Sequence, residues 1–228
     1  MGCCTITPEK IKADSIQLDT KHLENVTTLE TAPDKALEDA EHGRLEEVYT
    51  TAKTLQQSVD WKVISTGPPS VKFLATTGAL ATSFRTPRVT DPYSIVKLLL
   101  DPLYRVQWDT TVLEFDTICV ISERDMIQRT VQAMVYPRER LERVAIKTRP
   151  AEVLVLTHSY SVARTKESAA VTAFVLEIFQ KKQWTLVEVT SQVDWQLPVT
   201  KTPQLMQSFA DWALSFHWAV QNILPLTA

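Results

Sequence analysis

Two opposite charges, Arg105 and Asp109, have a spacing that lets them act as a pair, either in binding or in a salt bridge. They stand four positions apart in a stretch expected to form a short helix, so both side chains lie on one face within ion-pairing distance. A guanidinium can hold a phosphate or a hydroxyl group, and the carboxylate can orient it or face a cationic group. The same spacing also fits an exposed salt bridge worth about 0.3 to 0.5 kcal/mol. Spacing alone leaves both interpretations open.

The first residues, Met1-Gly2-Cys3-Cys4, are similar to a terminus that carries myristate and palmitate. Gly2 becomes the myristate acceptor once Met1 is removed, and Cys3 or Cys4 can supply the second acyl chain that stable anchoring requires. The usual motif has Ser or Thr where this chain has Ile6. An unmodified cytosolic terminus is the alternative. We expect acylation, which places the protein on the cytoplasmic side of a membrane.

Residues that could support catalysis or hold a metal ion are scattered along the chain. The four histidines lack the short spacings of metal and nucleophile motifs, and four glycines form no phosphate-binding loop. Cys119, on an expected strand, is typical of a small buried hydrophobic residue. We therefore predict no catalytic residue, no metal site and no cofactor.

The composition places further limits on the kind of protein. Residues 1–60 carry 6 Lys and Arg against 12 Asp and Glu, whereas residues 61–228 carry 18 against 15, so an acidic segment precedes a mildly basic body. That small surplus of basic residues does not form the clusters with aromatic residues that nucleic-acid binding uses. Three cysteines give no disulfide framework, and no apolar stretch reaches the ~18 residues of a membrane-spanning helix. We expect an intracellular monomer that does not bind nucleic acid.

The elements that must position these residues follow from hydrophobic periodicity. Apolar residues at helical spacing predict a helix over 34–58, and short runs rich in β-branched and aromatic residues predict strands at 61–65, 71–76 and 79–85. Thr90 or Asp91 is expected to cap a helix with Pro92 in its first turn, and Asp101-Pro102 to start a shorter one. About six strands follow over 112–195, with breaks expected at 122–125, 137–140, 149–150, 164–168 and 180–183.

The last element is an amphipathic helix over 203–223, with Thr202 as its expected N-cap and Pro203 in its first turn. Its apolar stripe consists of Leu205, Phe209, Trp212, Phe216, Val220 and Ile223. Leu214 and Trp218 point away from that stripe, either to meet a membrane interface or to pack on residues 5–33. Antiparallel strands with one long helix predict an α+β fold in which the helix covers one face of a sheet.

A family resemblance makes these expectations more specific. Residues 101–109 read Asp-Pro-Leu-Tyr-Arg-Val-Gln-Trp-Asp, which resembles a helix motif of StAR-related lipid-transfer (START) domains, above all of their phosphatidylcholine-transfer members. Residues 137–139, Pro-Arg-Glu, are similar to the family's Pro-Arg-Asp turn, and the element order matches its helix-grip fold. The family's Gly-rich segment before the last helix and its choline-binding strand Trp have no counterpart here. The resemblance therefore implies the fold and leaves the lipid open.

The resemblance implies a curved antiparallel sheet wrapped around the last helix, with an apolar cavity inside. Arg105 and Asp109 are then expected to face a lipid, together with Phe209, Trp212 and Phe216 of the helix, while Trp108 packs between the short helix and the sheet. Arg164 and Lys166 would lie in a loop that gates the cavity; a solvated hairpin tip is the alternative.

The resulting hypothesis divides the chain into an acylated tether, residues 1–33, and a lipid-binding domain, residues 34–224. The domain would hold one phospholipid, sterol or ceramide for sensing or local transfer at a membrane. Two alternatives remain: a protein-interaction scaffold without a transferable ligand, and an enzyme of the cyclase type, which uses a similar shape.

Overall fold

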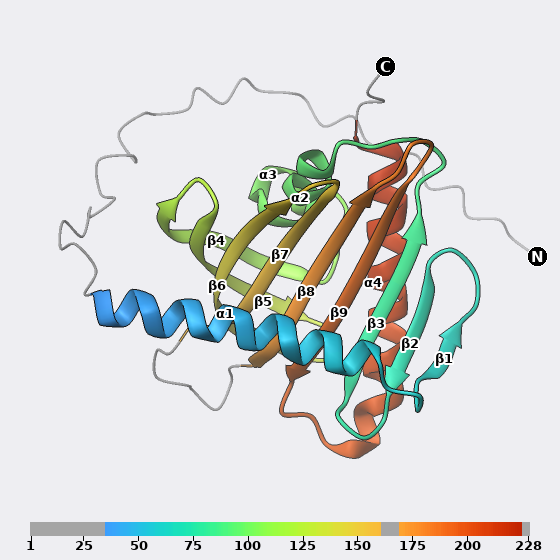
Figure 1. Ribbon diagram of the computed structural model, residues 1–228. Helices are drawn as coiled ribbons and strands as arrows, with labels where there is room; N and C mark the ends of the chain where they lie inside the picture. Colours follow the sequence, from blue (N-terminus) through green and yellow to red (C-terminus); the bar gives the residue numbers. More distant parts are fainter. Residues whose placement is uncertain (1–34, 161–168, 225–228) are drawn as a thin grey trace, which may run out of the picture.

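The computed structural model describes residues 35–160 and 169–224, with side chains from residue 43 onward. A single antiparallel sheet of nine strands dominates it, in the order β1-β2-β3-β9-β8-β7-β6-β5-β4 (Figure 1). The strands are β1 (Lys62–Ser65), β2 (Ser70–Leu74), β3 (Ala79–Arg85), β4 (Val112–Ser122), β5 (Asp125–Ala133), β6 (Pro137–Arg149), β7 (Glu152–Ser159), β8 (Ala170–Gln180) and β9 (Thr185–Asp194). The predicted three strands, two helices and six strands are confirmed.

Two helices cover opposite faces of this sheet (Figure 1). Helix α4 (Thr202–Asn222) closes the inner, concave face, and helix α1 (Lys35–Gln56) crosses the outer face over β7, β8 and β9. The alternation of side chains along each strand explains both contacts: β-sheet residues two apart share a face. Thus Ala145, Leu156 and Val175 pack on α1, while Val144, Val155 and Leu176 belong to the inner core.

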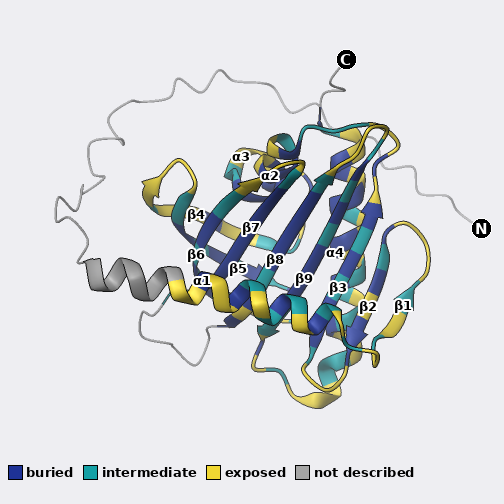
Figure 2. Cartoon of the chain, viewed as in Figure 1, coloured by how far each residue is buried: buried dark blue, intermediate teal, exposed yellow. Residues whose placement is uncertain are grey.

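The inner core forms where the apolar stripe of α4 meets the sheet, as predicted. Phe209, Trp212, Phe216 and Val220 are all buried there, and Figure 2 shows the buried stripe of α4 facing the strands. Burying each such side chain contributes roughly 1.5 to 3 kcal/mol. The buried apolar residues that recur along α4 therefore hold this helix against the concave face.

The short helices α2 (Pro92–Leu100) and α3 (Pro102–Arg105) fill one end of the concave face. Asp91 caps α2 by accepting hydrogen bonds from the backbone N and the Oγ of Ser94, at 2.9 and 2.8 Å. Asp101 ends α2 and also caps α3 by accepting from the backbone N of Leu103 at 2.9 Å. Two consecutive Asp-Pro pairs thus start two helices, because proline suits the first helical turn and the preceding aspartate satisfies its free N–H groups.

Three expectations were wrong in detail. Residues 137–140 are not a break: the turn lies at 134–136 and Pro137 already pairs with Ala133, so Arg140 lies inside β6. Lys201, which follows a 3-10 turn, takes the N-cap position of α4 in place of Thr202, without a side-chain hydrogen bond. Cys119 is only half-buried, because β4 is an edge strand.

Some expectations lie outside the described residues: the tether at 1–33 with Gly2, Cys3 and Cys4, and the loop residues Arg164 and Lys166. Within residues 35–160 and 169–224, no helix is long and apolar enough to cross a lipid bilayer.

Candidate functional site

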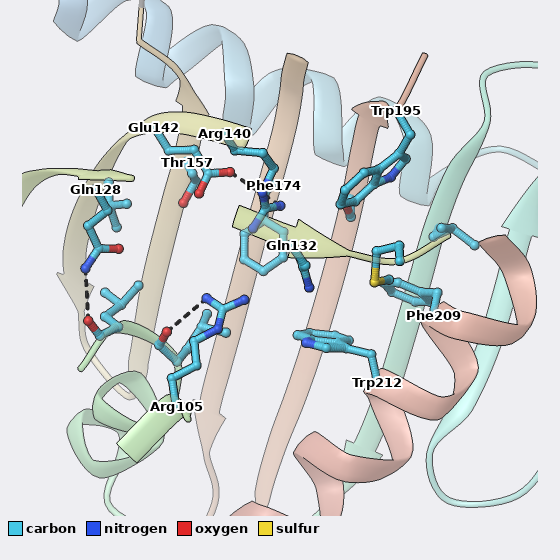
Figure 3. A pocket seen from close by; sticks show the side chains of 16 residues that line it. Arg105, Gln128, Gln132, Arg140, Glu142, Thr157, Phe174, Trp195, Phe209 and Trp212 are labelled. Carbon is cyan, nitrogen blue, oxygen red and sulfur yellow. Dashed lines mark hydrogen bonds and ion pairs between the residues drawn. The ribbon is translucent and has the colours of Figure 1, made fainter. Parts of the chain in front are cut away.

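A cavity lies between the inner face of the sheet, the α2–α3 region and α4 (Figure 3). The enclosed free volume of the cavity is about 40 Å³. The wider space between its walls, which includes open solvent at the mouth, is about 560 Å³. The polar side chains that line it are Arg105, Gln128, Gln132, Arg140, Glu142, Thr157 and Ser191; the apolar wall includes Met134, Phe174, Trp195, Phe209 and Trp212. Such a wall with a few buried polar groups is typical of a site for an amphipathic molecule.

Arg105 and Asp109 form a buried ion pair. Only 5% of Arg105 and 2% of Asp109 is exposed, and Nε of Arg105 donates to Oδ2 of Asp109 at 3.1 Å. The alternative of an exposed salt bridge is therefore wrong. Nη1 of Arg105 also donates to the Leu99 carbonyl at 3.1 Å, and Nε1 of Trp212 donates to Oδ2 of Asp109 at 3.0 Å. The pair thus joins α2, α3 and α4 at one end of the cavity.

A second buried pair, Arg140 and Glu142, faces the cavity from β6. The inward positions of a strand recur every second residue, so both side chains point to the concave face. Nη1 of Arg140 lies 3.4 Å from Oε1 of Glu142, and its guanidinium lies 5.5 Å from the centre of the Trp195 ring. Burial lowers the pKa of Arg140, and the charge of Arg105 lowers it further, against the opposing effects of Glu142 and Asp109.

The second pair did not follow from the sequence, because residues 137–140 were expected to form a break between strands. A residue in a turn has no defined inward direction. The signal was the alternation of Arg140, Glu142 and Val144, which are all buried. Charged residues rarely lie at inward positions of a strand unless they are paired. Because Arg140 and Glu142 are charged, their positions did not look like buried positions in the sequence.

Side-chain amides of β5 complete the polar end of the cavity. Nε2 of Gln128 donates to the Leu100 carbonyl at 2.9 Å, and Nε2 of Gln132 donates to Oγ1 of Thr111 at 2.8 Å. Both bonds tie the sheet to the segment that carries α2 and α3, so the amide nitrogens are occupied. The amide groups therefore hold the two sides of the cavity together.

The predicted aromatic residues of α4 are only partly brought to the cavity. Phe209 and Trp212 line it, with stacked rings 5.4 Å apart. Phe216 lies one turn further along, where it packs against Trp108 at 5.1 Å and Phe84 at 5.8 Å between ring centres, and it does not line the cavity.

Trp108 is a packing residue, as expected, but its main partners lie on α4 rather than on the sheet. Its Nε1 donates to the Leu98 carbonyl at 2.9 Å, and its ring centre lies 5.9 Å from that of Trp212. A buried indole that satisfies its N–H and packs against tilted aromatic neighbours is a stabilising element. Trp108 therefore fixes α3 against α4 and keeps Arg105 in place.

Comparisons of sequence give no relatives: no family model matches the chain, and no curated protein matches it. Solved structures do match in fold. Human StAR-related lipid transfer protein 5 is 14% identical, covers 80% of this chain and 97% of its own, and has a TM-score of 0.66. Human STARD10 is 16% identical, covers 83% and 80%, and has a TM-score of 0.61. A STAR-related lipid transfer protein of Xanthomonas axonopodis is 9% identical, covers 72% and 98%, and has a TM-score of 0.55.

These matches confirm the predicted fold: a large antiparallel sheet with a C-terminal helix, the helix-grip arrangement of START domains. The closer motif likeness to phosphatidylcholine-transfer members stays a prediction. At such low identities the likeness establishes the fold alone, so the role of the cavity must be argued from its own residues.

Proposed function

We propose that this chain, which has the helix-grip fold of StAR-related lipid-transfer domains, is a lipid-binding module that holds one lipid beneath α4. One observation carries the proposal: the cavity is lined by buried charged groups, Arg105, Arg140 and Glu142, and by aromatic side chains. Buried charges are costly unless they serve a structure or a ligand. An amphipathic ligand can contact both kinds of lining at once.

The space inside sets a condition on the proposal. A water molecule needs roughly 10 to 15 Å³ of such space, so the free 40 Å³ is enough for about three waters and not for an acyl chain. Entry of a lipid therefore requires Phe209, Trp212 or Met134 to move outward together with part of α4. Two of the structural neighbours, the human StAR-related lipid transfer protein 5 and the Xanthomonas axonopodis protein, are named for lipid transfer, which supports the same kind of cargo.

The limited space favours a second candidate function, a scaffold whose cavity holds no transferable ligand. In that case the aromatic wall of the cavity is a filled core, and the outer helix α1 is the surface offered to a partner. Extraction of the purified protein with organic solvent, followed by mass spectrometry, separates the two functions. A single lipid in stoichiometric amount supports the module; its absence after purification from several hosts supports the scaffold.

We further propose the membrane address that the sequence suggests: residues 1–33 as an acylated tether, with Gly2, Cys3 and Cys4 as acceptors, and residues 34–224 as the lipid-binding domain. A flexible tether of that length spans about 25 to 35 Å, which keeps the cavity close to one membrane. Arg164 and Lys166 belong to the same proposal as residues of the gate. Sensing or local transfer suits such an anchored module.

Replacement of Gly2 tests the membrane address. Gly2→Ala removes the only acceptor of myristate in the motif, and Cys3 and Cys4 then lack the initial membrane contact that precedes palmitoylation. We expect the variant to move from the membrane fraction to the soluble fraction of cells, with Ile6→Ala as a control that leaves the acceptor intact. An N-terminal peptide with an unmodified Gly2 in the wild-type protein contradicts the proposal.

A further inference from the structure

Two neighbouring buried polar atoms, one on a cavity-lining residue and one just behind the wall, lack a hydrogen-bond partner within the described part of the chain. They are Nε of Arg140 and Oγ1 of Thr130. Thr130 and Arg140 are paired directly across strands β5 and β6, so their side chains lie next to each other on the same face. Arg140 is 6% exposed and Thr130 is 0% exposed. Unpaired buried polar atoms are uncommon in folded proteins, and two neighbouring ones indicate an unfilled position for a polar group.

Arg105, the arginine of the helix motif, differs from Arg140 because it is already hydrogen-bonded within the protein. Its Nε is bonded to Asp109 and its Nη1 to the Leu99 carbonyl. Asp109 in turn accepts from Trp212 and from Thr111, so this pair is complete without a ligand. Arg105 therefore serves the structure, and its positive charge remains at the far side of the cavity.

Arg140 retains the edge of the guanidinium that a ligand needs. Glu142 Oε1 lies 3.4 Å from Nη1, while Nε has no hydrogen-bond partner among residues 35–160 and 169–224. The Nε edge of a guanidinium presents parallel N–H groups that match the two oxygens of a carboxylate or phosphate. In Figure 3 the side chains of Arg140 and Arg105 point toward one another across the cavity, so a group between them would face two positive charges.

From this geometry we infer that Arg140, with Thr130 beside it, binds the acidic headgroup of a single-chain amphiphile, a carboxylate or a phosphate monoester. The inference rests on the proposed lipid-binding function and specifies its ligand class. Arg140, which lines the cavity, donates from its Nε edge to the acid, Thr130 lies beside Arg140 behind the cavity wall, and the chain lies along Phe209 and Trp212. A single chain is the smallest apolar tail, which suits the limited space beneath α4.

Binding of ligands that differ only in the headgroup tests the inference on the full chain after removal of lipids. Oleate, oleoyl lysophosphatidate and oleyl alcohol share one chain, and the first two carry the acid. Isothermal titration calorimetry should show that at least one acid binds about tenfold or more tightly than the alcohol, the effect expected of a charge-assisted hydrogen bond. The acid that binds more tightly identifies the headgroup.

The double variant Arg140→Gln with Glu142→Gln removes both charges together, so that no buried charge is left alone. It should bind oleyl alcohol as the wild type does and lose the preference for the acid. Arg124→Gln, an exposed arginine in the turn between β4 and β5, is the matched control and should keep that preference. A circular dichroism spectrum like that of the wild type establishes that the double variant is folded.

The outcomes separate the inference from the proposed function. Equal affinity of the wild type for acid and alcohol overturns the inference and leaves lipid binding in place. A preference for acid that survives in the double variant assigns the headgroup to another residue and also overturns it. Failure of all three ligands to bind also overturns the inference, and the proposed function is then judged separately by the extraction of bound lipid described above.

Discussion

At the scale of single residues, the buried pair of Arg105 and Asp109 is a structural joint. Trp212 of α4 and the Leu99 carbonyl of α2 both bond to it, so the pair holds three helices at one end of the cavity. A buried pair of this kind contributes little by its mere presence, because desolvation offsets its attraction. The loss of one partner is strongly destabilising, because it leaves the other charge buried and uncompensated.

Replacement of Arg105 should therefore destabilise the protein strongly. We expect Arg105→Ala to lower the free energy of unfolding by about 3 to 5 kcal/mol, because Asp109 then remains buried without its cation. Arg88→Ala removes an exposed arginine and should change it by less than about 0.5 kcal/mol. Urea denaturation measures both. Equal stability of the two variants would show that Asp109 does not depend on Arg105.

His217 provides a pH-dependent contribution from the flank of the same helix. Burial lowers the pKa of His217, and its Nε2 lies 2.7 Å from Nε2 of Gln221, whose N–H can donate only to an unprotonated ring nitrogen. A histidine with a lowered pKa in the folded state takes up its proton more readily when unfolded. Its contribution to stability is thus complete above the unfolded pKa of about 6.5 and is lost as the pH falls below it.

The sign of that effect is testable with a non-titrating ring. From pH 7 to pH 5 the Tm of the wild type should fall more than that of His217→Phe, which keeps the aromatic contact with Phe84. All other titrating groups are common to both proteins, so the difference between the two curves belongs to position 217. Parallel curves would mean that His217 stays neutral or stays charged in both states.

At the scale of elements, the two sides of helix α4 differ in burial. Its inner stripe closes the cavity, while Leu214 and Trp218 on its outer side are 56% and 54% exposed. The sequence predicted this division from the 3.6-residue period alone. Two large apolar residues on the outer side suit contact with the membrane interface when α4 moves, and Trp is frequent at that depth.

Trp218→Ala should weaken binding of the protein to phospholipid vesicles without a loss of stability, because an exposed indole contributes little to the fold. Val59→Ala, an exposed apolar residue in the turn after α1, serves as the control. Vesicle co-sedimentation measures the effect. If binding is unchanged but thermal stability falls, Trp218 packs on residues 5–33, the other interpretation of its position.

At the scale of the whole molecule, periodicity and turn residues predicted most of the fold, because each element buries one clear face. Local sequence patterns were enough to predict helix α4 and the starts of α2 and α3 at the two Asp-Pro pairs. The polar end of the cavity did not follow from the sequence, since Arg140 and Glu142 acquire their inward direction from the pairing of β5 with β6. Phe216 shows the converse: it shares the periodicity of Phe209 but lies one turn too far along to reach the cavity.

The division of the cavity also explains why the sequence motif alone is a poor guide to its ligand. The helix motif contains Arg105, whose hydrogen bonds are internal, whereas the unsatisfied donor is Arg140, which directly follows the Pro-Arg-Glu motif and is not part of it. In the proposed headgroup site, other residues at positions 140 and 142 would select a different headgroup. Function thus depends on inward-facing strand residues that only the pairing of distant segments brings together.

The central claim, that the cavity beneath α4 holds a lipid, is tested most directly by filling it. Ser191 faces the cavity from β9, and its neighbour Gln192 lies on the opposite face of the same strand. Native mass spectrometry of wild type, Ser191→Leu and Gln192→Leu measures the bound lipid per chain. We expect one bound lipid in the wild type and in Gln192→Leu but none in Ser191→Leu. Equal lipid content in all three folded proteins would show that no lipid occupies the cavity.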